Sequence, residues 1–228
     1  MTTINSELII DTNILKENIS YMKTQLNEKS NFMAVIKSDA YGHNIENVVT
    51  NIDDLVAGYG VVRISEAKKN RKISNKKILL MQGIYSDDEL HKAIELNLDT
   101  VIHNKDQFSI IKNNNYFDGL WLKINTGMNR LGFEIDDFLN LYNKYLYDKK
   151  FILMSHLAAS NDINSLSNKN QFKLFDSLSE KINKDIKKSI ANTGCVMNFP
   201  SHTYDWVRCG IGIYCLLYTS PSPRDITP

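Results

Sequence analysis

Short apolar runs alternate with amphipathic stretches along most of the 228-residue chain. The apolar runs are candidate strands, and they cover residues 32–36, 58–62, 77–81, 100–102, 119–124, 151–156, 188–191 and 206–213. The stretches between them repeat apolar residues at helical spacing, and they cover residues 12–22, 87–96, 105–111, 136–147 and 168–186. Asp11, Ser86 and Asn104 precede three of these stretches and are residue types that cap helix N-termini. Strands and helices in alternation predict a parallel sheet with helical crossovers.

The number of candidate strands predicts the closure of that sheet. Eight strands indicate an α/β fold of the (β/α)8 barrel type, whose usual length is about 250 residues. The competing architecture is a doubly wound open sheet, but no Gly-x-Gly-x-x-Gly turn follows the first candidate strand. We therefore expect a barrel, in which reactive residues lie at the carboxyl ends of the strands.

The bulk composition narrows the range of partners. A hydrophobic content of 43% and a charged content of 23% are ordinary for a globular protein. A net charge of +1 gives no electrostatic reason to expect nucleic acid or an anionic membrane as a partner. No apolar run reaches membrane-spanning length, the start of the chain does not resemble a signal peptide, and the three cysteines show no metal-binding spacing. These features predict a cytoplasmic protein with free thiols and without a metal.

The most informative segment runs from Met33 to His43. Four apolar residues lead directly into Lys37, and a short polar turn that contains Tyr41 follows. This pattern predicts a buried strand that delivers the Lys37 amine to the rim of the sheet. Burial disfavours the charged form of a lysine, and a neutral amine can form a Schiff base with an aldehyde cofactor. The alternative interpretation is an ordinary strand followed by a solvated lysine.

Three further regions place polar side chains at predicted strand ends. Lys123 alternates with apolar neighbours and should point into the barrel, where a lysine either serves a function or pairs with a buried carboxylate. His156 follows the sixth candidate strand, a position where a lone histidine is more often structural than catalytic. Small and hydroxylated residues at 191–194 and 208–212 follow the last two strands, where barrels commonly bind phosphate.

Together these segments resemble the alanine racemase family, in which the same motifs occur in the same order. The likeness rests on Lys-x-x-x-Tyr-Gly-His at residues 37–43, Lys-x-Asn-Thr-Gly-Met-x-Arg-Leu-Gly at 123–132, the histidine at 156, Asn-Thr at 192–193 and Val-Arg-x-Gly-Ile at 207–211. Asn125 stands where the family pattern has aspartate. The resemblance implies pyridoxal 5′-phosphate as the cofactor, held by Lys37, Tyr41, His156, Asn192, Thr193, Arg208, Gly210 and Ile211.

The resemblance also implies roles for single residues. Lys37 would act as a general base on one face of the substrate Cα. Arg130 would hold the cofactor's ring oxygen and the substrate carboxylate, and Lys123 is the family's lysine that is often carbamylated. Arg208 would face the pyridine nitrogen and keep it unprotonated, because an arginine does not give up its proton.

The implied activity is the interconversion of L-alanine and D-alanine in a homodimer, which supplies D-alanine for peptidoglycan. In the family, a tyrosine from the C-terminal β domain of the partner subunit acts as the second acid/base. No residue of this chain can be assigned that role, because the matching region would lie beyond Tyr214, so we expect cofactor binding without useful racemisation. Two alternatives are a non-catalytic barrel of pyridoxal-phosphate homeostasis and a racemase for a broader range of amino acids.

The last residues differ in character from the rest of the chain. Residues 215–228 concentrate serine and proline and resemble the translation of a sequencing-library adapter; a natural Ser/Pro-rich tail is the alternative. We expect a single cofactor-binding barrel domain over residues 1–214, without its last helix and without the family's C-terminal β domain, followed by a non-native tail at 215–228.

Overall fold

The computed structural model describes residues 9–182 and 185–214, and within these ranges eight parallel strands form one sheet. The strands are β1 (Asn31–Val35), β2 (Gly58–Val61), β3 (Lys77–Leu80), β4 (Leu98–Ile102), β5 (Leu120–Lys123), β6 (Ile152–Met154), β7 (Lys187–Ser189) and β8 (Trp206–Cys209). Neighbouring strands follow the order β7-β6-β5-β4-β3-β2-β1-β8, so the first strand pairs with both the second and the last.

The sheet closes between β7 and β8. The backbone N–H of Asp205 donates to the carbonyl of Lys188 at 3.1 Å, and that of Arg208 donates to the carbonyl of Ala191 at 2.9 Å. The Ser189 hydroxyl adds a bond to the carbonyl of Trp206 at 2.8 Å. The predicted (β/α)8 barrel is therefore confirmed.

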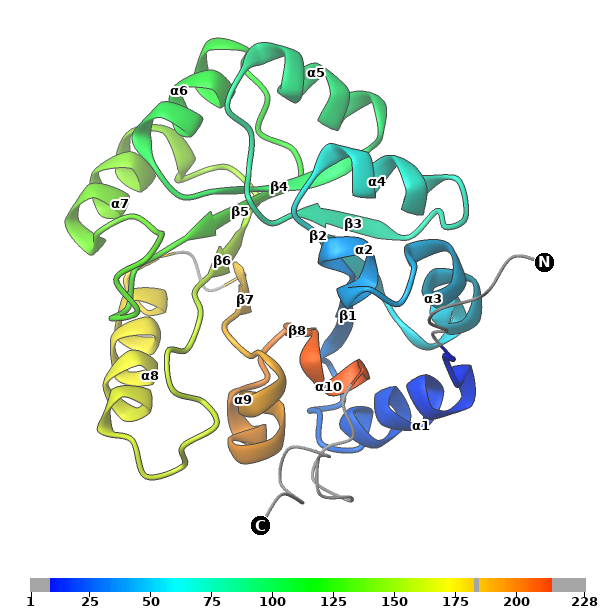
Figure 1. The fold of residues 1–228 in the computed structure, drawn as a ribbon. Coiled ribbons are helices and arrows are strands. Elements are labelled where there is room, and N and C mark those ends of the chain that lie inside the picture. The colour runs from blue at the N-terminus through cyan, green and yellow to red at the C-terminus, as the bar shows by residue number, and fades with distance from the viewer. Residues whose placement is uncertain (1–8, 183–184, 215–228) are drawn as a thin grey trace.

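Helices surround the barrel (Figure 1). They are α1 (Thr12–Lys23), α2 (Lys37–Tyr41), α3 (Ile45–Ile52), α4 (Ile64–Arg71), α5 (Asp87–Glu95), α6 (Lys105–Asn113), α7 (Ile135–Leu141), α8 (Leu166–Ser179), α9 (Thr193–Asn198) and α10 (Ile211–Tyr214). Short 3₁₀ turns cover Asp53–Leu55 and Pro200–His202, and a π-helical turn covers Tyr142–Leu146. None of the helices in the described residues has the length and apolar character needed to cross a bilayer.

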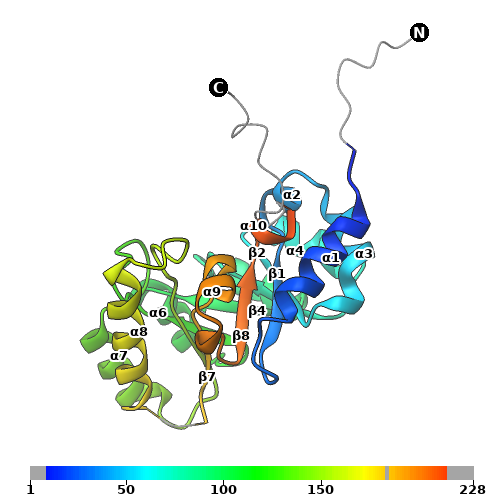
Figure 2. The ribbon, with the colours of Figure 1, turned by 90° about the horizontal axis from the view of Figure 1, so that it is seen from below.

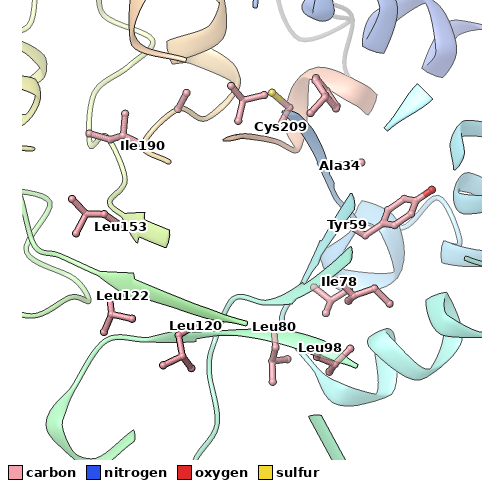
Figure 3. Packing of buried hydrophobic residues seen from close by; sticks show 14 of the residues in the cluster. Ala34, Tyr59, Ile78, Leu80, Leu98, Leu120, Leu122, Leu153, Ile190 and Cys209 are labelled. Carbon is pink, nitrogen blue, oxygen red and sulfur yellow. The ribbon is translucent and has the colours of Figure 1, made fainter. Parts of the chain in front are cut away.

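Strand side chains alternate between two apolar layers. One layer lies inside the barrel and comprises Met33, Leu79, Val101, Trp121, Met154 and Trp206. The other faces the helices and includes Ala34, Tyr59, Ile78, Leu80, Leu98, Leu120, Leu122 and Leu153 (Figure 3). Trp121 belongs to the inner layer while its neighbours Leu120 and Leu122 belong to the outer one, so Lys123 also points inward, as its alternation with apolar residues predicts.

Three predicted elements differ from the observed ones. The last strand ends at Cys209 rather than at residue 213, because the chain turns at Gly210 and the N–H of Ile213 donates back to its carbonyl at 2.9 Å. The helix predicted over 168–186 ends at Ser179, and the helix predicted over 136–147 continues as a π-helical turn after Leu141. Residues 215–228, predicted as a tail, lie outside the described residues.

The carboxyl ends of the strands meet at one end of the barrel. Helices α2 and α10, which follow β1 and β8, lie at this end (Figure 2). The rings of Tyr41 in α2 and Tyr214 in α10 are in contact, with 4.9 Å between their centroids. Segments from opposite ends of the sequence thus cover the same end of the barrel. The polar motifs singled out in the sequence lie at this end too.

Candidate functional site

A cavity of about 660 Å³ opens at the carboxyl ends of the strands. Basic side chains from four strand ends line it: Lys37 after β1, Lys123 and Arg130 at the end of β5 and on its loop, His156 after β6, and Arg208 in β8. Asp162 is the acidic residue of this lining within the described ranges, and it is exposed. The cavity therefore carries an excess of positive charge and suits a ligand with more than one anionic group.

Arg208 lies at the base of this cavity, and only 4% of its surface is exposed. Its guanidinium donates to the hydroxyl of Ser189 and, at 2.6 Å, to the carbonyl of Ser155. Its Nη2 also lies 3.4 Å from Nδ1 of His156. Burial lowers the pKa of Arg208 to about 10, which leaves it charged at neutral pH. All of these partners are neutral, so part of the buried charge is available to a ligand.

Lys123 is the last residue of β5, and 7% of its surface is exposed. Burial, with the positive charges of Arg208 and Arg130, lowers the pKa of Lys123 to about 8. No carboxylate of the described residues forms an ion pair with it. The paired-carboxylate interpretation from the sequence is therefore wrong, and the Lys123 amine is partly neutral near physiological pH.

His156 lies just after the end of β6 and lines the cavity. Burial and the positive charges of Arg208, Lys123, Arg130 and Lys37 lower its pKa to about 3. The imidazole is consequently neutral, and a neutral ring can lie flat against an aromatic ligand.

The loops after β7 and β8 approach each other closely. A Cβ on Gly210 would lie 2.3 Å from the Tyr41 hydroxyl, and a Cβ on Gly212 would lie 2.5 Å from Cγ2 of Thr193. The N–H of Gly212 donates to the Thr193 hydroxyl at 3.3 Å. These glycines are required by close packing, and Gly210 lines the cavity, while phosphate binding at these loops stays a prediction.

Asn192 has a clear structural use in this region. Its side-chain oxygen caps α9 by accepting from the N–H of Cys195 at 3.0 Å, and it also accepts from the Ser160 hydroxyl at 2.7 Å. Asn192 and Thr193 both line the cavity, and so do Tyr41, Gly210 and Ile211. The structure thus brings all the predicted site residues to one cavity, while their contacts with a cofactor stay predictions.

Arg130 lies on the loop that follows β5, and this loop is folded back on the strand. The N–H of Phe133 donates to the carbonyl of Lys123 at 2.8 Å, and the N–H of Asn125 donates to the carbonyl of Phe133 at 2.9 Å. The amide of Asn125 donates to Glu134 at 2.8 Å, and its oxygen accepts from two backbone N–H groups of the loop. Asn125 therefore shapes the loop that holds Arg130, and its amide hydrogens already have hydrogen-bond acceptors within this region.

The sequence motifs did not single out the residues that support this site. Ser189 accepts from Arg208, and Gln171, which is 1% exposed, donates to the Thr126 hydroxyl at 3.0 Å and to the carbonyl of His156 at 2.9 Å. Gln171 shares a helix face with the buried Phe172 and Phe175. Polar residues on the buried face of this helix, Gln171 and Asn168, are the signal that could have found it.

The fold and the site define a class of protein, the (β/α)8 barrel with a basic cavity at the carboxyl ends of its strands. Residues 10–217 match the family model described as alanine racemase, N-terminal domain, and the chain belongs to this family. It is 37% identical over 211 residues to the alanine racemase of Vesicomyosocius okutanii, an alignment that covers 90% of this chain and 58% of that protein.

Solved structures support the same assignment. The biosynthetic alanine racemase of Pseudomonas aeruginosa superposes with a TM-score of 0.83 at 28% identity, covering 90% of this chain and 58% of that one. The alanine racemase of Bartonella henselae with covalently bound pyridoxal phosphate has the same fold, with a TM-score of 0.80 at 21% identity, covering 90% of this chain and 59% of that one. The chain spans slightly more than half the length of the relatives it matches.

Proposed function

We propose that this chain is the cofactor-binding barrel of an alanine racemase and that it holds pyridoxal 5′-phosphate through Lys37. The observation that carries the proposal is the basic cavity, in which Arg208 and Lys123 are buried without a carboxylate partner in the described residues. A phosphate ester and a substrate carboxylate together would neutralise this charge. Family membership and the covalent cofactor of the Bartonella henselae protein agree with it.

The residues of the cavity suit the parts of this cofactor. The backbone near Gly210 and Ile211, the Thr193 hydroxyl and the Tyr41 hydroxyl lie together and would bind the phosphate. Asn192 lies beside them, and the neutral His156 would lie against the pyridine ring. Arg208 would donate to the ring nitrogen, and Arg130 to the ring oxygen and the substrate carboxylate.

The chemistry of the reaction depends on a proton at the substrate Cα. When bound, the cofactor supplies an electron sink that makes this proton acidic. Lys37 would hold the cofactor through its aldehyde, and its amine, once free, would accept the Cα proton of the substrate. Arg208 stays charged and would offer only a donor to the ring nitrogen, so this nitrogen would remain unprotonated and the electron sink would be limited.

Lys123 is proposed to react with carbon dioxide. Its amine, neutral in part because its pKa is about 8, attacks the carbon of CO₂; a C–N bond forms and a proton leaves for solvent. The resulting carbamate carries one negative charge beside Arg208 and Arg130. A cation that burial and its neighbours disfavour would thereby become an anion that the same neighbours stabilise.

The activity of the whole protein is proposed by family membership: interconversion of L-alanine and D-alanine in a homodimer. The longer relatives extend beyond the part matched here, and the second acid/base is proposed to come from the partner subunit. The alternative with the same cavity is a barrel that binds the cofactor without turnover, and the experiment below separates the two.

The first test is the site of covalent attachment. Pyridoxal 5′-phosphate is added to the chain, the C=N bond is reduced with borohydride, and modified peptides are identified by mass spectrometry. We expect modification of Lys37 at low cofactor concentration, its loss in Lys37→Ala, and its retention in Lys72→Ala, which changes an exposed lysine. Modification spread over surface lysines in place of Lys37 would contradict the proposal.

The second test asks whether the bound cofactor acts on alanine. Alanine is incubated with the loaded chain in D₂O, and exchange of its Cα proton is followed by NMR. We expect exchange that Lys37→Ala abolishes. Attachment at Lys37 without exchange would favour the non-catalytic barrel instead.

A further inference from the structure

The segment after Lys37 has an unusual backbone. Ser38, Asp39, Ala40 and Tyr41 have φ of 55°, 53°, 57° and 54°, so α2 is a turn of left-handed helix made of non-glycine residues. Each such residue is disfavoured relative to the right-handed form, because its Cβ comes close to the following carbonyl oxygen. Strain of this kind persists only where surrounding contacts hold it, and it is concentrated at functional sites.

The Glu66 carboxylate provides such a contact from another element. Its Oε1 accepts from the N–H of Ser38 at 2.7 Å, across 28 positions of sequence. Its Oε2 accepts from the N–H groups of Val62 and Arg63 at 2.9 and 3.0 Å, at the start of α4. One half-buried carboxylate therefore joins the first residue of the left-handed turn to the end of the neighbouring β2 strand.

The turn connects two groups of the proposed site. Lys37 precedes it and Tyr41 ends it, and the Lys37 Nζ lies 5.7 Å from the centre of the Tyr41 ring. The Tyr41 hydroxyl is the atom packed against Gly210. A left-handed turn of fixed geometry thus sets the direction of the Lys37 amine and the position of the Tyr41 hydroxyl together.

We propose that Glu66 is a positioning residue that holds the left-handed turn and so orients Lys37 toward the cofactor aldehyde. This inference rests on the proposed function, because it concerns attachment at Lys37. Glu66 does not touch the cavity itself, and it is absent from the motifs of the sequence analysis. Loss of its negative charge should weaken the bond to the Ser38 N–H and allow the turn to relax.

The chain offers a matched control for the simpler role of capping a helix. Glu89 is the third residue of α5 as Glu66 is of α4, it is also half-buried, and its Oε2 accepts from the N–H of Tyr85 at 2.7 Å. It has no bond to α2 and does not line the cavity. Both Glu66→Gln and Glu89→Gln should therefore lower the melting temperature, the first by more because its carboxylate accepts three N–H bonds and that of Glu89 accepts one, while only the first disturbs Lys37.

The experiment measures borohydride-trapped attachment of pyridoxal 5′-phosphate to Lys37 against cofactor concentration, in the unchanged 228-residue chain and in both variants. We expect Glu66→Gln to weaken apparent binding at Lys37 about tenfold, in line with loss of a charge-assisted hydrogen bond. We expect Glu89→Gln to stay within about twofold of the unchanged chain, since it loses only a helix cap. Equal binding in the two variants would overturn the role of Glu66.

Failure of the proposed function and failure of the positioning role give different results. Absence of attachment at Lys37 in the unchanged chain would defeat the proposed function, whereas equal variants would defeat only the positioning role. If Glu66→Gln does not fold, hydrogen exchange of the Ser38 amide in the unchanged chain decides. Slow exchange supports the bond to Glu66, and exchange as fast as in an open peptide overturns it.

Discussion

At the scale of single residues, burial and two neighbouring arginines lower the pKa of Lys123. Arg208, Arg130 and the low exposure of the amine all disfavour its charged form, and together they bring its pKa from 10.5 to about 8. Between pH 8 and 10.5 the unfolded chain binds more protons than the folded chain. Folding stability contributed by this residue therefore rises with pH across that window, and the full penalty is present below pH 8.

Replacing this lysine tests the penalty directly. Lys123→Met keeps the length of the side chain and removes the charge, so we expect it to raise the free energy of unfolding by roughly 1–3 kcal/mol at pH 7. The gain should nearly vanish at about pH 11, where Lys123 is neutral in the folded chain and largely neutral in the unfolded chain. Urea denaturation at both pH values in buffers free of carbon dioxide measures this, and a gain that does not change with pH would contradict the pKa shift.

The hydrogen bond from Asn125 to Glu134, in the loop that holds Arg130, can be tested by replacing the amide with a carboxylate. Its Nδ2 donates to Glu134 at 2.8 Å, so Asn125→Asp would set two carboxylates against each other. We expect a loss of about 1 kcal/mol in the free energy of unfolding at neutral pH. The double variant with Glu134→Gln should recover it, since the glutamine amide can donate in the opposite direction. Additive losses in the double variant would show that the two side chains do not interact.

At the scale of elements, Arg71 joins two connections of the barrel. It ends α4 and donates to the carbonyls of Ser74 and Lys76 before β3, at 3.1 and 2.8 Å. It also donates to the carbonyls of Leu96 and Asn97 before β4, both at 2.9 Å. One guanidinium thus ties together the turns that precede two adjacent strands.

Loss of that guanidinium should leave carbonyls without donors in both turns. We expect Arg71→Leu to lower the free energy of unfolding by about 2–4 kcal/mol, because the side chain makes four charge-assisted bonds. Lys72→Leu changes the next, exposed residue and should have little effect. Urea denaturation compares the two, and equal losses would rule out a specific contribution from Arg71.

At the scale of the whole molecule, the barrel joins β8 to β1 and β7, and so brings the loops for phosphate next to the turn after Lys37. A ligand that binds several strand ends at once stabilises the closed barrel but not the unfolded chain. Such a ligand raises the free energy of unfolding by about 2.7 kcal/mol when its concentration is 100 times its Kd.

We therefore expect pyridoxal 5′-phosphate to raise the melting temperature of the chain. Pyridoxal, which lacks the phosphate, should raise it much less, because the loops at Thr193 and Gly210 then bind nothing. Thermal unfolding followed by circular dichroism measures both. Equal shifts from the two compounds would show that the phosphate does not occupy these loops.

Local sequence patterns predicted much of the architecture and the residues that line the cavity. The caps at Asp11, Ser86 and Asn104 are confirmed, each accepting from a backbone N–H of its helix. The strand that leads to Lys37 is buried, as its apolar run indicates. The end of the last strand was misplaced, because Ile211 and Ile213 are apolar in a short helix as they would be in a strand.

The sequence by itself determined the order of strands and helices and the family, because these depend on spacing along the chain. The tertiary structure alone decided that Arg208 has neutral partners and that Lys123 has no carboxylate partner in the described residues. It also decided that Glu66 holds the left-handed turn after Lys37. The physical reason is that these properties depend on charges and donors from strand ends distant in sequence, which meet only when the barrel closes.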